Sequence, residues 1–188
     1  NSVLNLNDNI TVSAESSIEA DLELFYDNTS IKKTTTASTT ISTTYTFNSL
    51  GYHTLKASAN AGAESSDTEI EIFVKSPTVT QNKPAGLKYG LNKNPDNSVT
   101  FLLKAPLKND VFLIGDFNNW KLETSYQLFK DPNNEDFWIT VAGLDINTEY
   151  AYQYLIDDGL KIADPYAEKI LDPWNDKYIP EETFPNLK

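Results

Sequence analysis

The sequence predicts an all-β chain that folds into two tandem β-sandwich domains. Three observations support this fold class. Short segments that alternate polar and apolar residues recur along the chain, residues suited to tight turns separate them, and no segment has a convincing helical period. The chain has 188 residues, enough for two small domains. Aromatic residues make up 12% of it, which is enough for packed cores.

The first segment, residues 1–77, is predicted to form a sandwich of five or more strands. Threonine is dense from Thr34 to Thr46, and its β-branched side chain disfavours a helix there. Turn-forming residues separate the strands, for example Asp27-Asn28. The segment Leu50–Ala57 resembles a hairpin of bacterial immunoglobulin-like modules. The expected strands are Ile10–Ala14, Asp21–Asp27, Thr40–Phe47, Tyr52–Ala59 and Thr68–Lys75.

A linker at residues 78–84 and a second immunoglobulin-like sandwich at residues 85–188 are expected next. The linker assignment rests on Pro77 and Pro84, which flank a segment without a periodic apolar face. The second sandwich carries more aromatic residues, and Asp157-Asp158-Gly159 is a hairpin-turn sequence. Its expected strands are Ser98–Ala105, Val111–Ile114, Phe137–Val141 and Glu149–Ile156.

Composition excludes several classes of chemistry. The formal net charge is -12 and arginine is absent, so nucleic acid, anionic membrane surfaces and phosphorylated ligands are poor partners. The chain has no cysteine and a single histidine, His53, which removes most metal sites and nucleophilic triads. No cofactor and no metal site are therefore expected, and no apolar run is long enough to span a membrane.

Three spaced motifs carry a family resemblance. The apolar strand Val111–Ile114 runs into Gly-Asp-Phe-Asn-Asn-Trp at Gly115–Trp120. The tyrosine-rich segment Tyr150–Gly159 and then Ala163–Pro165 follow in order. In this order the motifs resemble family 48 carbohydrate-binding modules, also called isoamylase N-terminal or early-set domains, over about residues 86–176. The flanking residues 86–91 and 164–174 are similar to those of α-amylase-type enzymes from Bacteroidetes.

The resemblance implies a non-catalytic fragment of an α-glucan-degrading enzyme. Such modules precede the barrel of glycoside hydrolase family 13 enzymes, so a catalytic domain in cis is expected after residue 188. Glycoside hydrolysis needs two carboxylates that face each other across a cleft. The acidic residues here lie on turns of small sandwiches, where no deep pocket is expected, so no catalytic residue is expected in the fragment itself. A neutral glucan of the starch or glycogen type suits the composition, because aromatic faces and amide or ammonium donors recognise sugar rings and hydroxyl groups.

The resemblance also implies the site residues. Trp120 matches the family's first stacking tryptophan, and Gln153 stands where the family has a sugar-contacting lysine. The family's second tryptophan has no counterpart, because Lys161 lies in the run where it is expected. Trp174 is a candidate replacement, although it equally suits a contact with the catalytic domain. Asn119 is a further candidate contact, or simply a turn residue. Trp138 is expected in the core.

Two alternatives stay open. In the first alternative, both domains are scaffolds that position a catalytic barrel without binding sugar. In the second, they form an adhesion or surface-assembly stalk. In the leading hypothesis the protein is a monomer that is secreted, periplasmic or exposed at the cell surface. Residues 1–9 have no signal-peptide pattern and the chain contains no methionine, so it is expected to be a mature segment or a piece of a longer chain.

Overall fold

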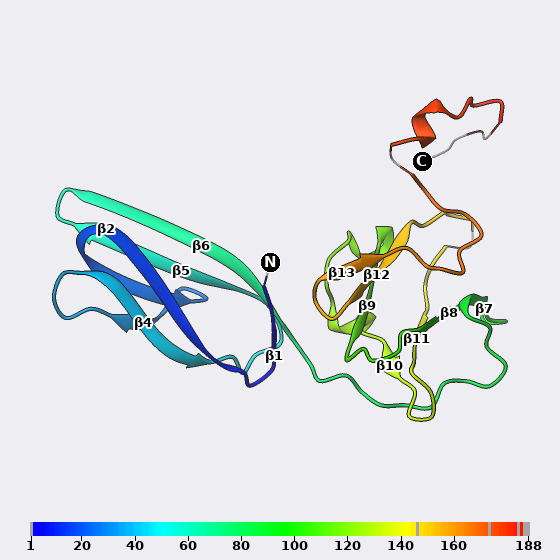
Figure 1. The fold of residues 1–188 in the computed structure, drawn as a ribbon, viewed down its shortest axis with the longest axis horizontal. Helices are drawn as coiled ribbons and strands as arrows, with labels where there is room; N and C mark the ends of the chain where they lie inside the picture. The colour runs from blue at the N-terminus through cyan, green and yellow to red at the C-terminus, as the bar shows by residue number, and fades with distance from the viewer. Residues whose placement is uncertain (1, 146, 173, 184, 186–188) are drawn as a thin grey trace. The chain divides into compact units, whose positions relative to one another are not determined.

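In the described part of the chain, the regular structure is β-strand apart from three short 3-10 helices, which confirms the predicted fold class (Figure 1). The structure is a computed structural model that describes residues 2–145, 147–172, 174–183 and 185. The chain divides into two compact units, residues 1–77 and 78–188. Within the described residues, no helix is long and apolar enough to cross a membrane.

The first unit is built around one long strand that takes part in two layers. Five strands lie in the order β1-β6-β5-β2-β3, in which β1 and β6 are parallel and the other neighbours are antiparallel. β4 pairs with the N-terminal part of β2. The bounds are β1 Ser2–Asn5, β2 Asn9–Tyr26, β3 Thr29–Lys33, β4 Ser38–Thr46, β5 Gly51–Ala61 and β6 Glu64–Lys75.

The sequence predicted two strands where β2 is continuous. Ser16 and Ser17 are two consecutive polar residues, and they interrupt the alternation of side chains that the prediction used. The backbone nevertheless stays extended, and only the register with β4 shifts between Glu15 and Ala20. β1 and β3 were not predicted, because strands of only four and five residues carry little periodic pattern.

The second unit is a sandwich of two sheets. One sheet has the order β10-β11-β8-β7 and the other has the order β13-β12-β9. Their apolar faces meet in one core, to which β8 and β11 contribute Phe101 and Phe137, and β9 and β12 contribute Leu113 and Tyr154. The bounds are β7 Gly90–Lys93, β8 Val99–Lys104, β9 Val111–Gly115, β10 Phe129–Lys130, β11 Asp136–Val141, β12 Tyr152–Ile156 and β13 Leu160–Ile162.

The residues assigned to a linker pack against the second unit. Thr80 forms a bridge with Lys130 of β10, and Gln81 accepts a 3.0 Å hydrogen bond from Trp138 Nε1. Lys83 Nζ lies 2.8 Å from a carboxylate oxygen of the buried Asp136. Residues 78–84, predicted as a linker from the two flanking prolines, are thus held by contacts with residues of β10 and β11. Trp138 is 6% exposed, which confirms its predicted core position.

Candidate functional site

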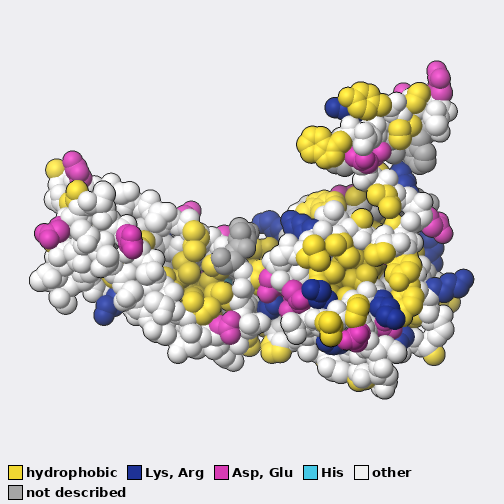
Figure 2. All heavy atoms as spheres, viewed as in Figure 1, with side chains coloured by type: hydrophobic (Ala, Val, Ile, Leu, Met, Phe, Trp, Pro, Cys, Tyr) yellow, Lys and Arg dark blue, Asp and Glu magenta, His cyan; other side chains and the backbone are white. Residues whose placement is uncertain are grey.

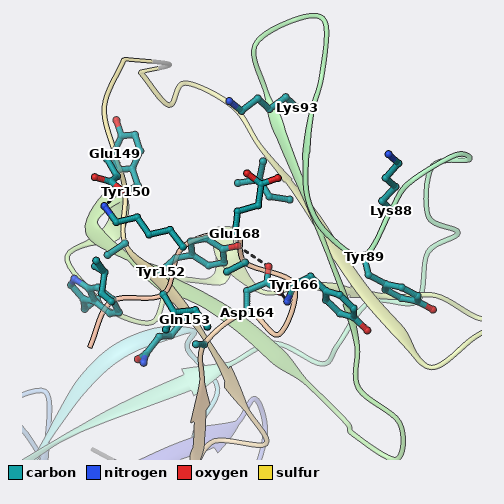
Figure 3. Close-up of a pocket in the computed structure, with 18 residues that line it drawn as sticks. Lys88, Tyr89, Lys93, Glu149, Tyr150, Tyr152, Gln153, Asp164, Tyr166 and Glu168 are labelled. Atoms are coloured by element: carbon teal, nitrogen blue, oxygen red, sulfur yellow. Dashed lines mark hydrogen bonds and ion pairs between the residues drawn. The ribbon is translucent and has the colours of Figure 1, made fainter. Parts of the chain in front are cut away.

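A groove of about 650 Å³ opens on the second unit (Figure 3). One wall comes from β7 and the residues before it, and another comes from residues 163–171. The turn after β9 contributes Trp120, and the start of β12 with its preceding loop contributes residues 149–153. The volume lies within the range of small-molecule sites in proteins, about 300 to 1,000 Å³. Figure 2 shows apolar and lysine side chains together on the visible face of this unit.

The turn after β9 is built by a buried asparagine. Asn118 is 3% exposed, and its side-chain oxygen accepts a 2.9 Å hydrogen bond from Gly115 N. Its Nδ2 donates a 3.0 Å hydrogen bond to Leu113 O. The amide side chain therefore satisfies two backbone groups where the strand ends, and the chain reverses direction at a fixed point.

Gly115 permits a close approach between this turn and the start of β12. A Cβ atom added to Gly115 would lie 2.5 Å from Ala151 O and 2.9 Å from a ring carbon of Phe117. The backbone there is extended, so space rather than conformation requires the glycine. The glycine and asparagine of the Gly-Asp-Phe-Asn-Asn-Trp motif thus fix the position of the tryptophan that ends it.

Trp120 is exposed and conformationally constrained. Its φ of 60° lies in the left-handed region, which is a rare conformation for a bulky residue. The side chain is held by a 3.0 Å hydrogen bond from Nε1 to Asp116 Oδ1, and Asp116 Oδ2 accepts a second bond from Ala151 N. The residue nevertheless stays 43% exposed. Because such strain is concentrated at functional positions, the oriented indole is a candidate ligand platform.

A buried carboxylate anchors the opposite wall. Asp164 is 2% exposed and accepts hydrogen bonds from the hydroxyl of Tyr152 at 2.7 Å and from Tyr166 N at 2.9 Å (Figure 3). Tyr154 donates a longer bond of 3.4 Å. Burial, reinforced by Asp164, raises the pKa of both phenols, Tyr152 and Tyr154, well above the ordinary value. Both hydroxyls therefore stay protonated at neutral pH and donate hydrogen bonds to the Asp164 side chain.

The two walls meet at a glycine of β7. Gly90 has a φ of +88°, and an added Cβ would lie 2.8 Å from Tyr166 Cβ. The rings of Tyr89 and Tyr166 stack with their centroids 5.3 Å apart. Burial and the neighbouring Asp136 raise the pKa of Tyr89, whose hydroxyl donates to that carboxylate. These contacts fix residues 163–167 against β7.

The charges in the groove are mixed. Lys169 Nζ lies 2.6 Å from a carboxylate oxygen of Glu149, and Glu168 contributes a second carboxylate. Lys88 and Lys93 on the β7 side form no ion pair within the described residues. The groove therefore combines ammonium, carboxylate, amide and phenol groups with apolar surface, which suits an uncharged ligand that carries many hydroxyl groups.

The groove contains two of the five candidate site residues inferred from the sequence. Trp120 and Gln153 line it, whereas Asn119, Lys161 and Trp174 are not among its described lining residues. Lys161 pairs with Leu155 in the β12–β13 ladder, so it shares the sheet face of Gln153 but lies farther along the sheet. Trp174 is 78% exposed and stands outside the groove.

The sequence did not predict the tyrosines and lysines in the walls formed by β7, by the residues before it and by residues 163–171. Tyr89, Tyr166, Lys88 and Lys93 lie in segments without strand periodicity or a specific motif. Tyr152 belongs to one of the three spaced motifs, but no site role was predicted for it. The one available signal is the family resemblance of the flanking segments 86–91 and 164–174, which does not by itself predict that they form one groove.

The region that holds the groove matches a known family of protein domains. Residues 88–175 match the model of the family described as carbohydrate-binding module 48 (isoamylase N-terminal domain). All described residues that line the groove fall within this range.

Two curated relatives come from Clostridium perfringens. The 1,4-alpha-glucan branching enzyme GlgB of strain ATCC 13124 is 28% identical over 104 residues, which cover 53% of this chain and 16% of the relative. GlgB 2 of strain 13 is also 28% identical over 104 residues and is covered to 15%. The chain thus spans less than a fifth of the length of these relatives.

Solved structures show only low overall similarity. A pullulanase from Anoxybacillus sp. LM18-11, complexed with maltotriose, has a TM-score of 0.35 and 18% identity, with coverage of 89% of this chain and 26% of that chain. An I-band fragment of titin has a TM-score of 0.36 and 13% identity, with coverage of 86% and 59%. On the family match, the second unit of this protein is similar to carbohydrate-binding module 48 over residues 88–175.

Proposed function

We propose that the second unit binds α-glucan of the starch or glycogen type and that it serves as a non-catalytic module of a larger glycoside hydrolase family 13 enzyme. The observation that carries the proposal is the exposed indole of Trp120, which lines the groove. The backbone of this residue is in the left-handed conformation. An indole face packs against the C–H face of a pyranose ring, and a fixed orientation lowers the entropy lost on binding.

Polar groups around the indole supply the specificity. Gln153 offers an amide that both donates and accepts, and Lys88 and Lys93 offer ammonium donors. These groups match hydroxyl groups without requiring charge on the ligand. The family match and the branching-enzyme relatives support the α-glucan class.

Affinity gel electrophoresis in amylopectin tests this proposal. We expect the protein to be retarded and Trp120→Ala to lose most of the retardation, with an affinity lower by about tenfold or more, because the largest ligand-facing aromatic surface is removed. Trp174→Ala is the matched control, since it removes an exposed indole outside the groove. Absence of retardation for the wild-type protein would leave the scaffold alternative.

We further propose that the first unit is an immunoglobulin-like spacer and that the parent enzyme is a monomeric, exported protein, secreted, periplasmic or exposed at the cell surface. A polymeric substrate and a chain without cysteine fit an oxidising exterior, and the flanking motifs resemble enzymes of Bacteroidetes. The catalytic domain in cis is its expected partner. Fractionation of source cells tests the location, and recovery in the cytoplasm would contradict it.

A further inference from the structure

A second, smaller cavity adjoins the groove. It has a volume of about 200 Å³ and shares four lining residues with the groove: Leu91, Lys93, Tyr150 and Tyr152. The two cavities therefore meet along a common wall formed by β7 and the start of β12.

The walls of the second cavity have the composition of a sugar subsite. Phe117 and Leu144 supply apolar surface, and both pack against the core of the unit. Phe117 also stacks on Tyr126 with a centroid distance of 5.1 Å, so its ring is held in place. Rigid apolar walls allow a ligand to bind without first ordering the site.

Unused polar groups border these walls. The side chain of Asn97 forms no hydrogen bond within the described residues, and it is exposed. The phenol oxygen of Tyr150 accepts a 3.2 Å hydrogen bond from Asp145 N, which leaves its own proton to donate. Lys93 Nζ, at the junction of the cavities, forms no ion pair within the part of the chain that the structure describes.

The carboxylate of this cavity is already occupied. Asp145 accepts hydrogen bonds from Asn147 N at 2.9 Å and from the hydroxyl of Thr148 at 3.1 Å. The bond from Asn147 N and then the bond from Thr148 lower the pKa of Asp145. The carboxylate is therefore charged at neutral pH and repels anions, which favours an uncharged polyol over a phosphate as the occupant.

We propose that a single α-glucan chain occupies both cavities, with one part against Trp120 and Gln153 and a distal part beside Asn97, Thr148 and Phe117. The inference rests on the proposed function and extends it. The ligand is a segment of several linked glucose units, and not only a single sugar or a short chain end. The shared wall at Tyr150 and Tyr152 carries the crossing between the two subsites.

Isothermal titration with maltotriose and with maltoheptaose tests the extension in the double variant Asn97→Gly/Thr148→Val. Asn97 has a φ of 64°, a conformation that glycine adopts freely, so this change removes an amide without strain. Thr148→Val removes a hydroxyl with little change of shape. Asn7→Gly is the matched control, because Asn7 is exposed and has a φ of 68° outside both cavities.

We expect the double variant to lose about fivefold or more in affinity for maltoheptaose and to bind maltotriose within about twofold of wild type. For each ligand, the affinity of the variant is compared with that of the wild-type protein. This comparison is needed because a longer sugar binds a short site more tightly simply by having more binding registers. Equal changes for both ligands, or no change for either, would overturn the extension while binding through Trp120 stands. Failure of the wild-type protein to bind either sugar would instead refute the proposed function.

Discussion

Among the residues that the structure describes, three turns place two consecutive residues in the left-handed region, and one of these turns differs from the others. The pairs are Asp27-Asn28 in the first unit and Asn119-Trp120 and Asp157-Asp158 in the second unit. Asp and Asn tolerate this region because their short side chains form local hydrogen bonds. Trp120 has no such advantage, so its turn is maintained by surrounding contacts.

The two aspartate-led turns follow one plan. Asp27 Oδ1 accepts a 2.9 Å bond from Thr54 N, and Asp157 Oδ1 accepts a 2.9 Å bond from Asn109 N. Each carboxylate also has a basic partner: His53 Nδ1 is 2.6 Å from Asp27 Oδ2, and Lys108 Nζ is 3.3 Å from Asp157 Oδ2. Here the left-handed residues serve the fold, because their side chains join the hairpin to its neighbours.

In the turn at Asn119-Trp120, a neighbouring side chain stabilises the turn instead of the side chains in the left-handed positions. The side chain that stabilises it is Asn118, which is buried below the turn, and the residue in the left-handed position projects an apolar ring toward solvent. Where hairpin geometry is the only requirement, the sequence uses Asp and Asn. A large aromatic residue at the same kind of position supports the binding role proposed for Trp120.

The largest effect is expected from Asn118→Ala. The substitution leaves Leu113 O and Gly115 N without partners in a buried position, so the free energy of unfolding of the second unit should fall by about 2 to 4 kcal/mol. Urea denaturation followed by tryptophan fluorescence measures it, because all three tryptophans lie in the second unit. Asn119→Gly is the control, with an expected change of about 0.5 kcal/mol or less. Equal losses in both variants would contradict the proposed role of Asn118.

An intermediate effect is expected from Asp116→Ala, which frees Trp120 Nε1 and Ala151 N. The free energy of unfolding should fall by about 1 kcal/mol, and affinity for amylopectin by about threefold to tenfold, because the indole loses its fixed orientation. Glu123→Ala removes a nearby carboxylate that makes no bond to the indole and serves as control. Retardation in amylopectin equal to that of wild type would show that the acceptor is unnecessary.

The smallest effect concerns acid pH and the aspartate-led turns. Burial opposes ionisation of Asp157, but hydrogen bonds from Asn109 N and Asp110 N and the Lys108 ammonium outweigh it and lower the pKa. A folded-state pKa below the unfolded value of 3.8 contributes stability above pH 3.8 that is lost as pH falls through the folded value.

We therefore expect Asp157→Asn to flatten part of the decline in the stability of the second unit between about pH 5 and about pH 2, by roughly 0.5 kcal/mol, the scale of a solvent-screened pair. Tryptophan fluorescence at several pH values measures the slope. A variant with the wild-type slope would indicate that this turn does not contribute to the acid response.

The sequence was most informative where physical signals are local. Alternating side chains predicted the sandwich class and most long strands, and the Asp27-Asn28 and Asp157-Asp158 turns were predicted from residue type alone. Burial of Trp138 followed from its apolar neighbours on a strand. In each case the deciding interactions lie within a few residues of one another.

The groove was harder to predict because its walls meet only in the folded chain. Gly90 and Tyr166 are far apart in sequence, and neither has a pattern that indicates their contact. The position of Lys161 depends on the register of β12 with β13, which sets how far along the sheet it lies from Gln153. The packing of residues 78–84 also depends on buried acids, Asp131 and Asp136, nearly fifty residues away.

The continuous β2 has a consequence for how the first unit opens. Its N-terminal part pairs with β4, and its C-terminal part pairs with β5 and β3. Detaching either layer disturbs the backbone that supports the other one, so amide protons of β4 and β5 are expected to exchange with solvent through a shared opening event. We therefore expect the first unit to resist local unfolding and to unfold as one cooperative whole.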